Sequence, residues 1–249
     1  MSKQSTILQH IPNSITSLNL FSGCLSVVVS LNGHLTIAAY FIFVAAVFDF
    51  FDGFAARMLK THSEIGKELD SLADMVSFGV APASIMFGLL LKAASVRGYP
   101  ADIFTCGWYI SLPAFIIAVF SALRLAKFNL DTRQTESFIG LPTPANALFI
   151  CALAFTAQGS GFLAGLVENI YFLLVIVAVF SYLLIAELPL FSLKFKSFGW
   201  KKNQIRYIFI ALSAIILLLL RWPGLAVIIL LYILLSVVDL FLKKQTTVD

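Results

Sequence analysis

The sequence predicts an all-α, polytopic transmembrane helical bundle. Of its 249 residues, 60% are hydrophobic, only 12% are charged, and the mean hydropathy is +0.95. A soluble domain carries about 25% charged residues, so this chain has too little polar surface to coat a water-soluble globule. Its apolar runs are far longer than the strands of a membrane β-barrel. Lipid leaves backbone polar groups to be satisfied internally, and long apolar runs do this as helices.

Eight membrane spans are expected, because a helix needs about 20 apolar residues to cross a bilayer. We expect a single membrane domain over residues 1–249, since no linker or low-complexity stretch divides the chain. The expected spans are residues 14–32, 36–58, 67–92, 107–127, 142–163, 170–191, 204–220 and 223–242.

Helix breakers separate the first four spans. Asn32-Gly33-His34 ends the first span, and a polar stretch after Arg57 divides the second from the third. Pro82 is expected to bend the third span, because proline lacks a backbone N–H and clashes with the preceding turn. The run Arg97-Gly98-Tyr99-Pro100 then ends that span.

The later spans are bounded in the same way. The run Gly140-Leu141-Pro142 precedes the fifth span, and Pro142 or Pro144 suits its first turn. Between the seventh and eighth spans, Trp222-Pro223-Gly224 indicates either a tight turn or a kink. This pair of spans is therefore the least sharply defined by the sequence.

The basic residues orient the bundle. Of the 17 Lys and Arg residues, all but Lys92, Arg97 and Arg221 fall on one side of this span map. The positive-inside rule makes that side cytoplasmic, together with both termini. The net charge of +4 follows from this topology and calls for no nucleic-acid partner. We expect a multi-pass integral membrane protein, in the cytoplasmic (inner) membrane if the cell is bacterial.

Four aspartates gather around the loop between the second and third spans. Residues three or four apart share one face of a helix, so Asp49 and Asp52 form one stripe and Asp70 and Asp74 form another. The stripes converge if the two helices pack as an antiparallel hairpin. The charge map places them at the cytoplasmic face, where a site can meet water-soluble substrates and still open to lipid.

This arrangement indicates metal-assisted phosphoryl chemistry. Carboxylates in an apolar chain need a counter-charge, and hard oxygen ligands suit Mg²⁺ or Mn²⁺. Two such ions about 4 Å apart clamp a phosphate during in-line displacement. Gly53 and Ala56 leave one stripe without bulk, and Arg57 offers a forked donor that matches phosphate oxygens.

Two other classes of function stay open at this point. A divalent-cation transporter would use the aspartates as a binding site, because intramembrane acids often mark ion pathways. It leaves Gly53, Ala56 and Arg57 unexplained. A non-catalytic membrane scaffold leaves all four aspartates without a purpose.

The whole run from Asp49 to Asp74 reads D-x2-D-G-x2-A-R-x8-G-x3-D-x3-D. It resembles the signature of the CDP-alcohol phosphatidyltransferases, an integral-membrane family, at every fixed position. The resemblance implies a six-span catalytic core over residues 14–192, an added helix pair over residues 204–242, and a homodimer. It also implies that a CDP-linked lipid binds here and that an alcohol attacks its lipid-side phosphate, which releases CMP.

Further roles follow from the resemblance. The four aspartates would ligate two divalent ions, Mg²⁺ or Mn²⁺, and Asp74 would be the general base, although spacing alone does not separate it from Asp70. Polar side chains near one face of the first span would either contact the nucleotide or serve as caps and interhelical hydrogen bonds. The residues expected around the CDP-lipid are Asn13, Thr16, Asn19, Asp52, Gly53, Ala56, Arg57, Ser63 and Gly66.

Three further runs bear on the acceptor alcohol. Residues 78–83, 124–129 and 140–145 are similar to the branch of the family that transfers the phosphatidyl group from CDP-diacylglycerol to L-serine. Glycerol 3-phosphate and inositol remain alternative acceptors. A cation must hold the serine carboxylate, and Arg124 is the first choice because it lies one turn inside the span from Lys127. The full set of acceptor candidates is Arg124, Lys127, Asn129 and Arg133.

Overall fold

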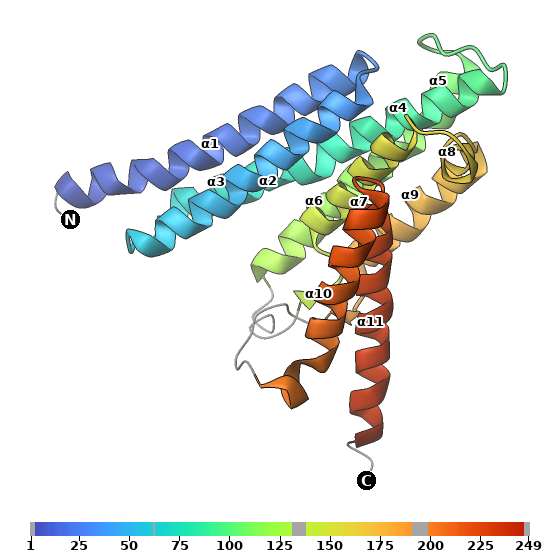
Figure 1. Ribbon diagram of the computed structural model, residues 1–249. Coiled ribbons are helices and arrows are strands. Elements are labelled where there is room, and N and C mark those ends of the chain that lie inside the picture. The colour runs from blue at the N-terminus through green and yellow to red at the C-terminus, as the bar shows by residue number, and fades with distance from the viewer. Residues whose placement is uncertain (1–2, 62, 131–137, 191–198, 247–249) are drawn as a thin grey trace.

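The computed structural model describes residues 3–61, 63–130, 138–190 and 199–246, and helices dominate these ranges (Figure 1). The elements in chain order are α1 (Lys3–Leu31), α2 (Leu35–Met58), α3 (Glu64–Asp74), the π-helix η1 (Met75–Val80), α4 (Ala81–Val96), α5 (Cys106–Ser111), the 3₁₀-helix η2 (Leu112–Phe115), α6 (Ile116–Leu130), β1 (Phe138–Ile139), α7 (Thr143–Thr156), α8 (Phe162–Val167), α9 (Ile170–Ile185), β2 (Pro189–Leu190), α10 (Trp200–Leu220) and α11 (Gly224–Thr246).

The expected polytopic helical bundle is confirmed. Among the described residues, five helical segments are long and apolar enough to cross a membrane, and three shorter apolar helices accompany them. These segments follow the expected spans in the same order. The long ones are His10–Leu31, Leu35–Met58, Glu64–Val96, Cys106–Leu130 and Asn203–Leu220, and the short ones are Thr143–Thr156, Ile170–Ile185 and Gly224–Leu240.

Two expected boundaries are wrong. The first span, expected near residues 14–32, lies within helix α1, which begins earlier, at Lys3, because hydropathy marks the membrane segment and not the end of the helix. The fifth span stops at Thr156, and Gly161 takes a φ of 91° that favours glycine before α8 begins. The sixth span stops at Ile185, since the chain becomes extended ahead of Pro189.

The third span changes helix type close to its proline. Residues Met75–Val80 form a π-helix that joins α3 to α4, and Pro82 lies in the first turn of α4. A wider turn accommodates a proline that offers no N–H to the preceding turn. The π-helix directly follows Asp74, so it sets how the end of the aspartate stripe is presented to the neighbouring helices.

A short β-bridge, which the sequence did not predict, fixes the start of α7. Phe138 pairs with Leu190 and Ile139 with Pro189 in an antiparallel register. The next residues are held by the end of α9, where the Leu141 N–H donates to the Leu183 carbonyl over 2.8 Å. The first turn of α7 is thereby held beside the last turn of α9.

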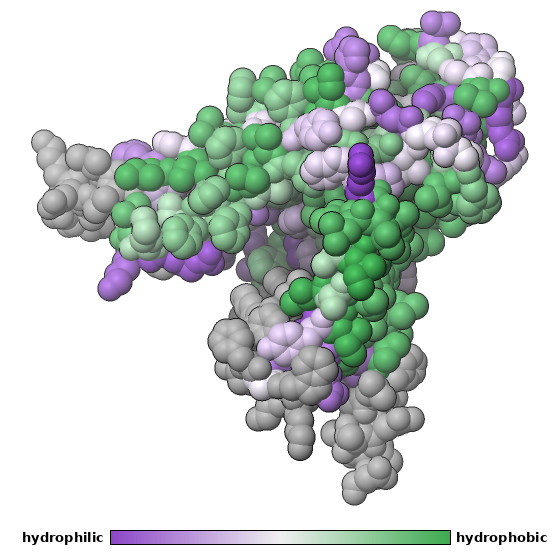
Figure 2. Space-filling model, viewed as in Figure 1, coloured by the Kyte–Doolittle hydropathy of each residue, from purple (hydrophilic) through white to green (hydrophobic). Residues whose placement is uncertain are grey.

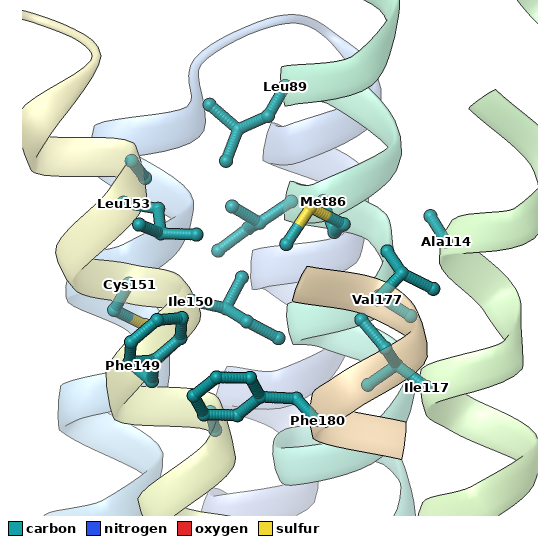
Figure 3. Packing of buried hydrophobic residues seen from close by; sticks show 14 of the residues in the cluster. Met86, Leu89, Ala114, Ile117, Phe149, Ile150, Cys151, Leu153, Val177 and Phe180 are labelled. Carbon is teal, nitrogen blue, oxygen red and sulfur yellow. The ribbon is translucent and has the colours of Figure 1, made fainter. Parts of the chain in front are cut away.

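The core lies where α4, α6, α7 and α9 meet (Figure 3). Phe149 of α7 stacks on Phe180 of α9 with ring centroids 3.9 Å apart. Met86 of α4 and Ile117 of α6 are fully buried in the same cluster. Packing of this kind holds the helices rigidly enough to position polar side chains at their ends.

The last two helices form a hairpin, so the break at Trp222 is a turn rather than a kink (Figure 1). Helix α11 packs against α7, and Trp222 stacks on Phe155 with centroids 5.4 Å apart. Figure 2 shows hydrophobic side chains covering the outward face of this hairpin. A surface of this kind suits contact with lipid.

Helices α1 and α2 run side by side and, with α3 and η1, make the layer that carries the aspartates (Figure 1). Gly23 of α1 touches η1 so closely that a Cβ there would lie 2.4 Å from Ser77 Oγ and 2.8 Å from Ser77 Cα. The Ser77 hydroxyl donates to the Asn19 carbonyl over 3.0 Å. A small residue thus allows α1 and η1 to approach closely, as is common at helix interfaces of membrane proteins.

Substituting Gly23→Ala should lower the free energy of unfolding by about 1–3 kcal/mol, because the added methyl group meets the backbone of η1. Thermal unfolding of the detergent-solubilised protein measures the loss. Gly165→Ala on α8 is the matched control, since its Cβ would meet nothing within 4 Å among the described residues. Equal stability of the two variants would contradict this account of the α1–η1 contact.

Candidate functional site

The aspartate hairpin is built by a tight connection between α2 and α3. Lys60 takes a positive φ of 51° just after α2 ends. Ser63 then begins α3 as its N-cap, since its hydroxyl accepts from the Gly66 N–H over 2.9 Å. The predicted turn from one stripe to the other is therefore present in the fold.

Three of the four aspartates converge. The carboxylate oxygens of Asp49, Asp70 and Asp74 lie within 4.8 Å of one another, which is a spacing that suits a shared cation. Each of the three side chains is partly buried. The expectation that all four would meet is only partly met, because Asp52 is turned toward Thr16 of α1 and lies outside this group.

A cavity of about 240 Å³ lies between α1, α2 and α3. Asp70 borders the cavity as well as the carboxylate cluster, so the two features adjoin. Of the residues expected around the CDP-lipid, most line this cavity, while Asn19 and Arg57 do not. The residues that line it are Pro12, Asn13, Thr16, Asp52, Gly53, Ala56, Thr61, Ser63, Gly66, Lys67 and Asp70.

Small residues make room for this cavity. A Cβ at Gly53 would meet nothing within 4 Å among the described residues, so this position opens directly into free space. Gly66 is the opposite case, because its Cβ would lie 2.8 Å from Asn13 Oδ1 and from Ser63 Oγ. Gly66 therefore lets α3 pack closely against α1. Gly53 leaves the cavity beside α2 free of a side chain, so a ligand there can approach the backbone.

The two predicted residues outside the cavity differ from each other. Arg57 is exposed near the end of α2. Asn19 is fully buried one turn from Thr16, and neither polar atom of its side chain has a hydrogen-bond partner among the described residues. Burial of an unpaired amide costs free energy. The interhelical hydrogen bond expected as one role of Asn19 is made by its backbone carbonyl, which accepts from the Ser77 hydroxyl, and not by its side chain.

Sequence reasoning missed Pro12, Thr61 and Lys67 as cavity residues. Lys67 counts as an ordinary cytoplasmic charge in the sequence, yet it follows Gly66 directly and faces the cavity three residues before Asp70. That position inside the motif was the available signal. Thr61 lies in the connection between the helices, where helical periodicity gives no indication of direction.

The candidates for binding the acceptor differ in burial: Arg124 is buried and Lys127 is exposed. Arg124 is 7% exposed, donates from Nη1 to the Thr143 hydroxyl over 3.4 Å, and lies 5.1 Å from the centre of the Phe128 ring. It lies near enough to Asp74 for the two charges to interact. Lys127 is exposed.

The other two acceptor candidates, Asn129 and Arg133, provide no charge at the site within the described residues. Asn129 donates to the Ser71 hydroxyl over 2.9 Å, which ties the end of α6 to α3. Arg133 lies outside the described residues. Among the described candidates, Arg124 is therefore the cation that is both buried and directed at the site.

The donors present fit a divalent cation. The oxygens Oδ2 of Asp52 and Oδ1 of Asp74 are buried and have no hydrogen-bond partner within the described part of the chain. Carboxylate oxygens left unpaired at low dielectric constant are strongly unfavourable without a positive partner. Hard oxygen donors of this kind are the ligands that Mg²⁺ and Mn²⁺ prefer.

Several known proteins from bacteria and an archaeon are similar to this chain. A CDP-diacylglycerol–serine O-phosphatidyltransferase of Bacillus subtilis is 36% identical over 149 residues, which are 60% of this chain and 77% of that protein. An enzyme of the same name from Mycobacterium leprae is 35% identical over 196 residues, which are 76% of this chain and 60% of that protein. The archaetidylserine synthase of Methanothermobacter thermautotrophicus is 34% identical over 157 residues, 62% of this chain and 61% of that protein.

These alignments span less than two thirds of the mycobacterial and archaeal relatives, so the similarity concerns a shared part of each protein. A sequence model of the CDP-alcohol phosphatidyltransferases matches residues 9–186. That range takes in the cavity, the carboxylate cluster and Arg124. The chain belongs to the CDP-alcohol phosphatidyltransferase family.

Proposed function

We propose that this protein transfers the phosphatidyl group of CDP-diacylglycerol to the hydroxyl of L-serine, giving phosphatidylserine and CMP. The observation that carries the proposal is the cluster of Asp49, Asp70 and Asp74 beside the cavity of about 240 Å³. The bacterial relatives are named for CDP-diacylglycerol and serine, and the archaeal relative is also named for a serine lipid. Serine is thus the acceptor that these names share.

The cavity is suited to the CDP group of the donor. Asn13, Thr16 and Ser63 offer amide and hydroxyl groups, and Lys67 offers a positive charge for a phosphate. Gly53 lets a flat or phosphorylated group approach the backbone of α2. The pyrophosphate would lie toward Asp70, where the cavity adjoins the carboxylate cluster.

Two divalent ions, Mg²⁺ or Mn²⁺, would be held by Asp49, Asp52, Asp70 and Asp74. When bound, they would supply positive charge that offsets the charge building up on the pyrophosphate during transfer. The protein itself holds the carboxylates together and leaves the space beside Gly53 free of side chains. Without a cation, the three nearest carboxylates would repel one another in a poorly solvated site.

The reaction itself is an in-line displacement. A bond forms between the serine hydroxyl oxygen and the lipid-side phosphorus, and the bond from that phosphorus to the CMP oxygen breaks. The hydroxyl proton passes to Asp74, whose charge interacts with that of Arg124. Because a carboxylate is a weak base for an alcohol, proton removal accompanies bond formation and positioning supplies much of the rate.

The remaining proposals concern the membrane setting. We infer that the α2–α3 connection and both termini face the cytoplasm, as the asymmetry of basic residues indicates. The loop before α5 would then face the opposite side. We also expect a homodimer, on the ground of the family resemblance, with the six-span core in residues 14–192 and the α10–α11 hairpin added to it.

The acceptor can be tested with purified protein, CDP-diacylglycerol, Mg²⁺ or Mn²⁺, and a panel of alcohols. CMP release should depend on L-serine and be slow with glycerol 3-phosphate or inositol. CMP release with inositol but not with serine would reject the proposed acceptor and keep the reaction class. Metal flux into vesicles without CMP release would instead favour the transporter.

The role of Asp74 can be tested with Asp74→Asn, which keeps the shape and removes the negative charge. Transfer should fall by at least about 10³-fold, because both a ligand and the proton acceptor are lost. Glu64→Gln is the control, since this carboxylate lies exposed in the first turn of α3. Near-normal turnover of correctly inserted Asp74→Asn protein would remove Asp74 from the mechanism.

Sidedness can be tested by labelling cysteines with a membrane-impermeant maleimide, in a Cys24→Ala background. Cys106 is exposed at the start of α5 and should be labelled in intact cells. A Cys106→Ala, Lys60→Cys variant moves the thiol to the α2–α3 connection, and this thiol should react only after the membrane is permeabilised. The reverse pattern would invert the proposed orientation.

A further inference from the structure

Helices α6 and α7 each carry one fully buried polar side chain without a hydrogen-bond partner within the described residues. Neither the amide nitrogen nor the amide oxygen of Asn146 has a hydrogen-bond partner within the described residues, and the same holds for the Ser121 hydroxyl. The buried Ser181 of α9 also lacks a partner within the described residues, whereas Ser84 donates to the Val80 carbonyl and Ser111 to the Gly107 carbonyl. Burial of unpaired polar groups costs free energy, so Ser121 and Asn146 indicate a partner that the chain itself does not provide.

Both side chains lie one helical turn from the buried Arg124–Thr143 pair. Ser121 precedes Arg124 by three residues on α6, and Asn146 follows Thr143 by three residues on α7. Arg124 lies near the C-terminal end of α6, and Thr143 is the first residue of α7. The step from Arg124 back to Ser121 and the step from Thr143 on to Asn146 therefore both lead away from the helix ends and into the bundle. Each step is about 4.5 Å along a helix axis, so Ser121 and Asn146 each lie one turn deeper in the bundle than their neighbours Arg124 and Thr143.

The π-helix closes this region on the side of the aspartates. Helices α6 and α7 both pack against η1, which begins directly after Asp74. A Cβ at Gly79 of η1 would lie 3.1 Å from Ser121 Cβ, so Ser121 faces η1. Arg124, one turn after Ser121 on α6, lies near enough to Asp74 for the two charges to interact. From the aspartate cluster into the bundle, the groups therefore follow in this order: the Asp74 carboxylate, the Arg124 guanidinium, and then the Ser121 hydroxyl and the Asn146 amide.

We propose that Ser121 and Asn146, together with Arg124, form the subsite that binds the carboxylate of the acceptor amino acid. The inference rests on the proposed function and names the part of the substrate that this region recognises. A serine carboxylate is repelled by the aspartate cluster and attracted by Arg124, so it lies beside the guanidinium, on the side of Ser121 and Asn146. There it receives hydrogen bonds from the Ser121 hydroxyl and the Asn146 amide, and the serine hydroxyl is left directed at Asp74.

This arrangement gives selectivity for an alcohol that carries a carboxylate. An acceptor without that group, such as ethanolamine, leaves the guanidinium, hydroxyl and amide buried and unpaired. A site built from buried donors rejects a ligand that lacks their acceptor. The three side chains act on binding and orientation of the acceptor, and they make no contact with the CDP cavity residues in this account.

The test is steady-state kinetics of the purified full-length protein, with CDP-diacylglycerol saturating and CMP release as the readout. Asn146→Ala and Ser121→Ala should each raise the KM for L-serine by about 10- to 100-fold, because each removes a hydrogen bond to a charged group. The KM for CDP-diacylglycerol should stay within about twofold of the wild-type value. Asn146→Asp should be worse than Asn146→Ala, since it opposes one carboxylate with another.

Controls separate this inference from its alternatives. Ser111→Ala removes an equally buried serine hydroxyl that is satisfied by its own helix, and it should leave the KM for L-serine unchanged. An unchanged KM for L-serine in Asn146→Ala and Ser121→Ala would overturn the inference while leaving the proposed function intact. Tighter serine binding by Asn146→Asp would overturn it too, because that result assigns the ammonium group to this position. A wild-type protein that releases no CMP with serine would overturn the proposed function itself.

Discussion

The constraint on which the rest of the site depends is the mutual repulsion of carboxylates in a poorly solvated place. Oxygens of Asp49, Asp70 and Asp74 lie within 4.8 Å of one another, with Asp49 on the apolar helix α2 and the other two on the amphipathic helix α3. Such a group stays ionised only with positive charge close by. Arg124 supplies part of it from α6, and the donor set fits divalent ions for the remainder. The α2–α3 connection and the contact of α1 with η1 hold the group in place.

Glycines let three helices approach this centre from different sides. Gly23 brings α1 onto η1, Gly66 brings α3 onto the Asn13 side chain, and Gly53 leaves open space beside the same stripe of aspartates. The resulting layer encloses a cavity next to the carboxylates. A substrate with a phosphate and a lipid tail can reach such a place from the membrane, while a small polar acceptor can enter from water.

Much of this could be predicted from the sequence, because hydropathy, charge asymmetry and helical periodicity are local signals. They gave the order of the spans, the hairpin and the convergence of three aspartates. They did not give the β-bridge between Phe138 and Leu190, which joins segments far apart in the chain. Nor did they show that Lys67 faces the cavity or that Asn146 is buried without a partner, since the direction of a side chain depends on helices packed from elsewhere.

The central claim is that the aspartate cluster holds divalent cations, and Mn²⁺ binding measured by electron paramagnetic resonance tests it most directly. Purified wild-type protein in detergent should bind Mn²⁺ saturably, at two ions per chain, and Mg²⁺ should compete. Asp49→Asn and Asp70→Asn should each lose that binding while the helical content stays the same. Saturable binding that persists unchanged in both variants, or no saturable binding by the wild-type protein, would contradict the account.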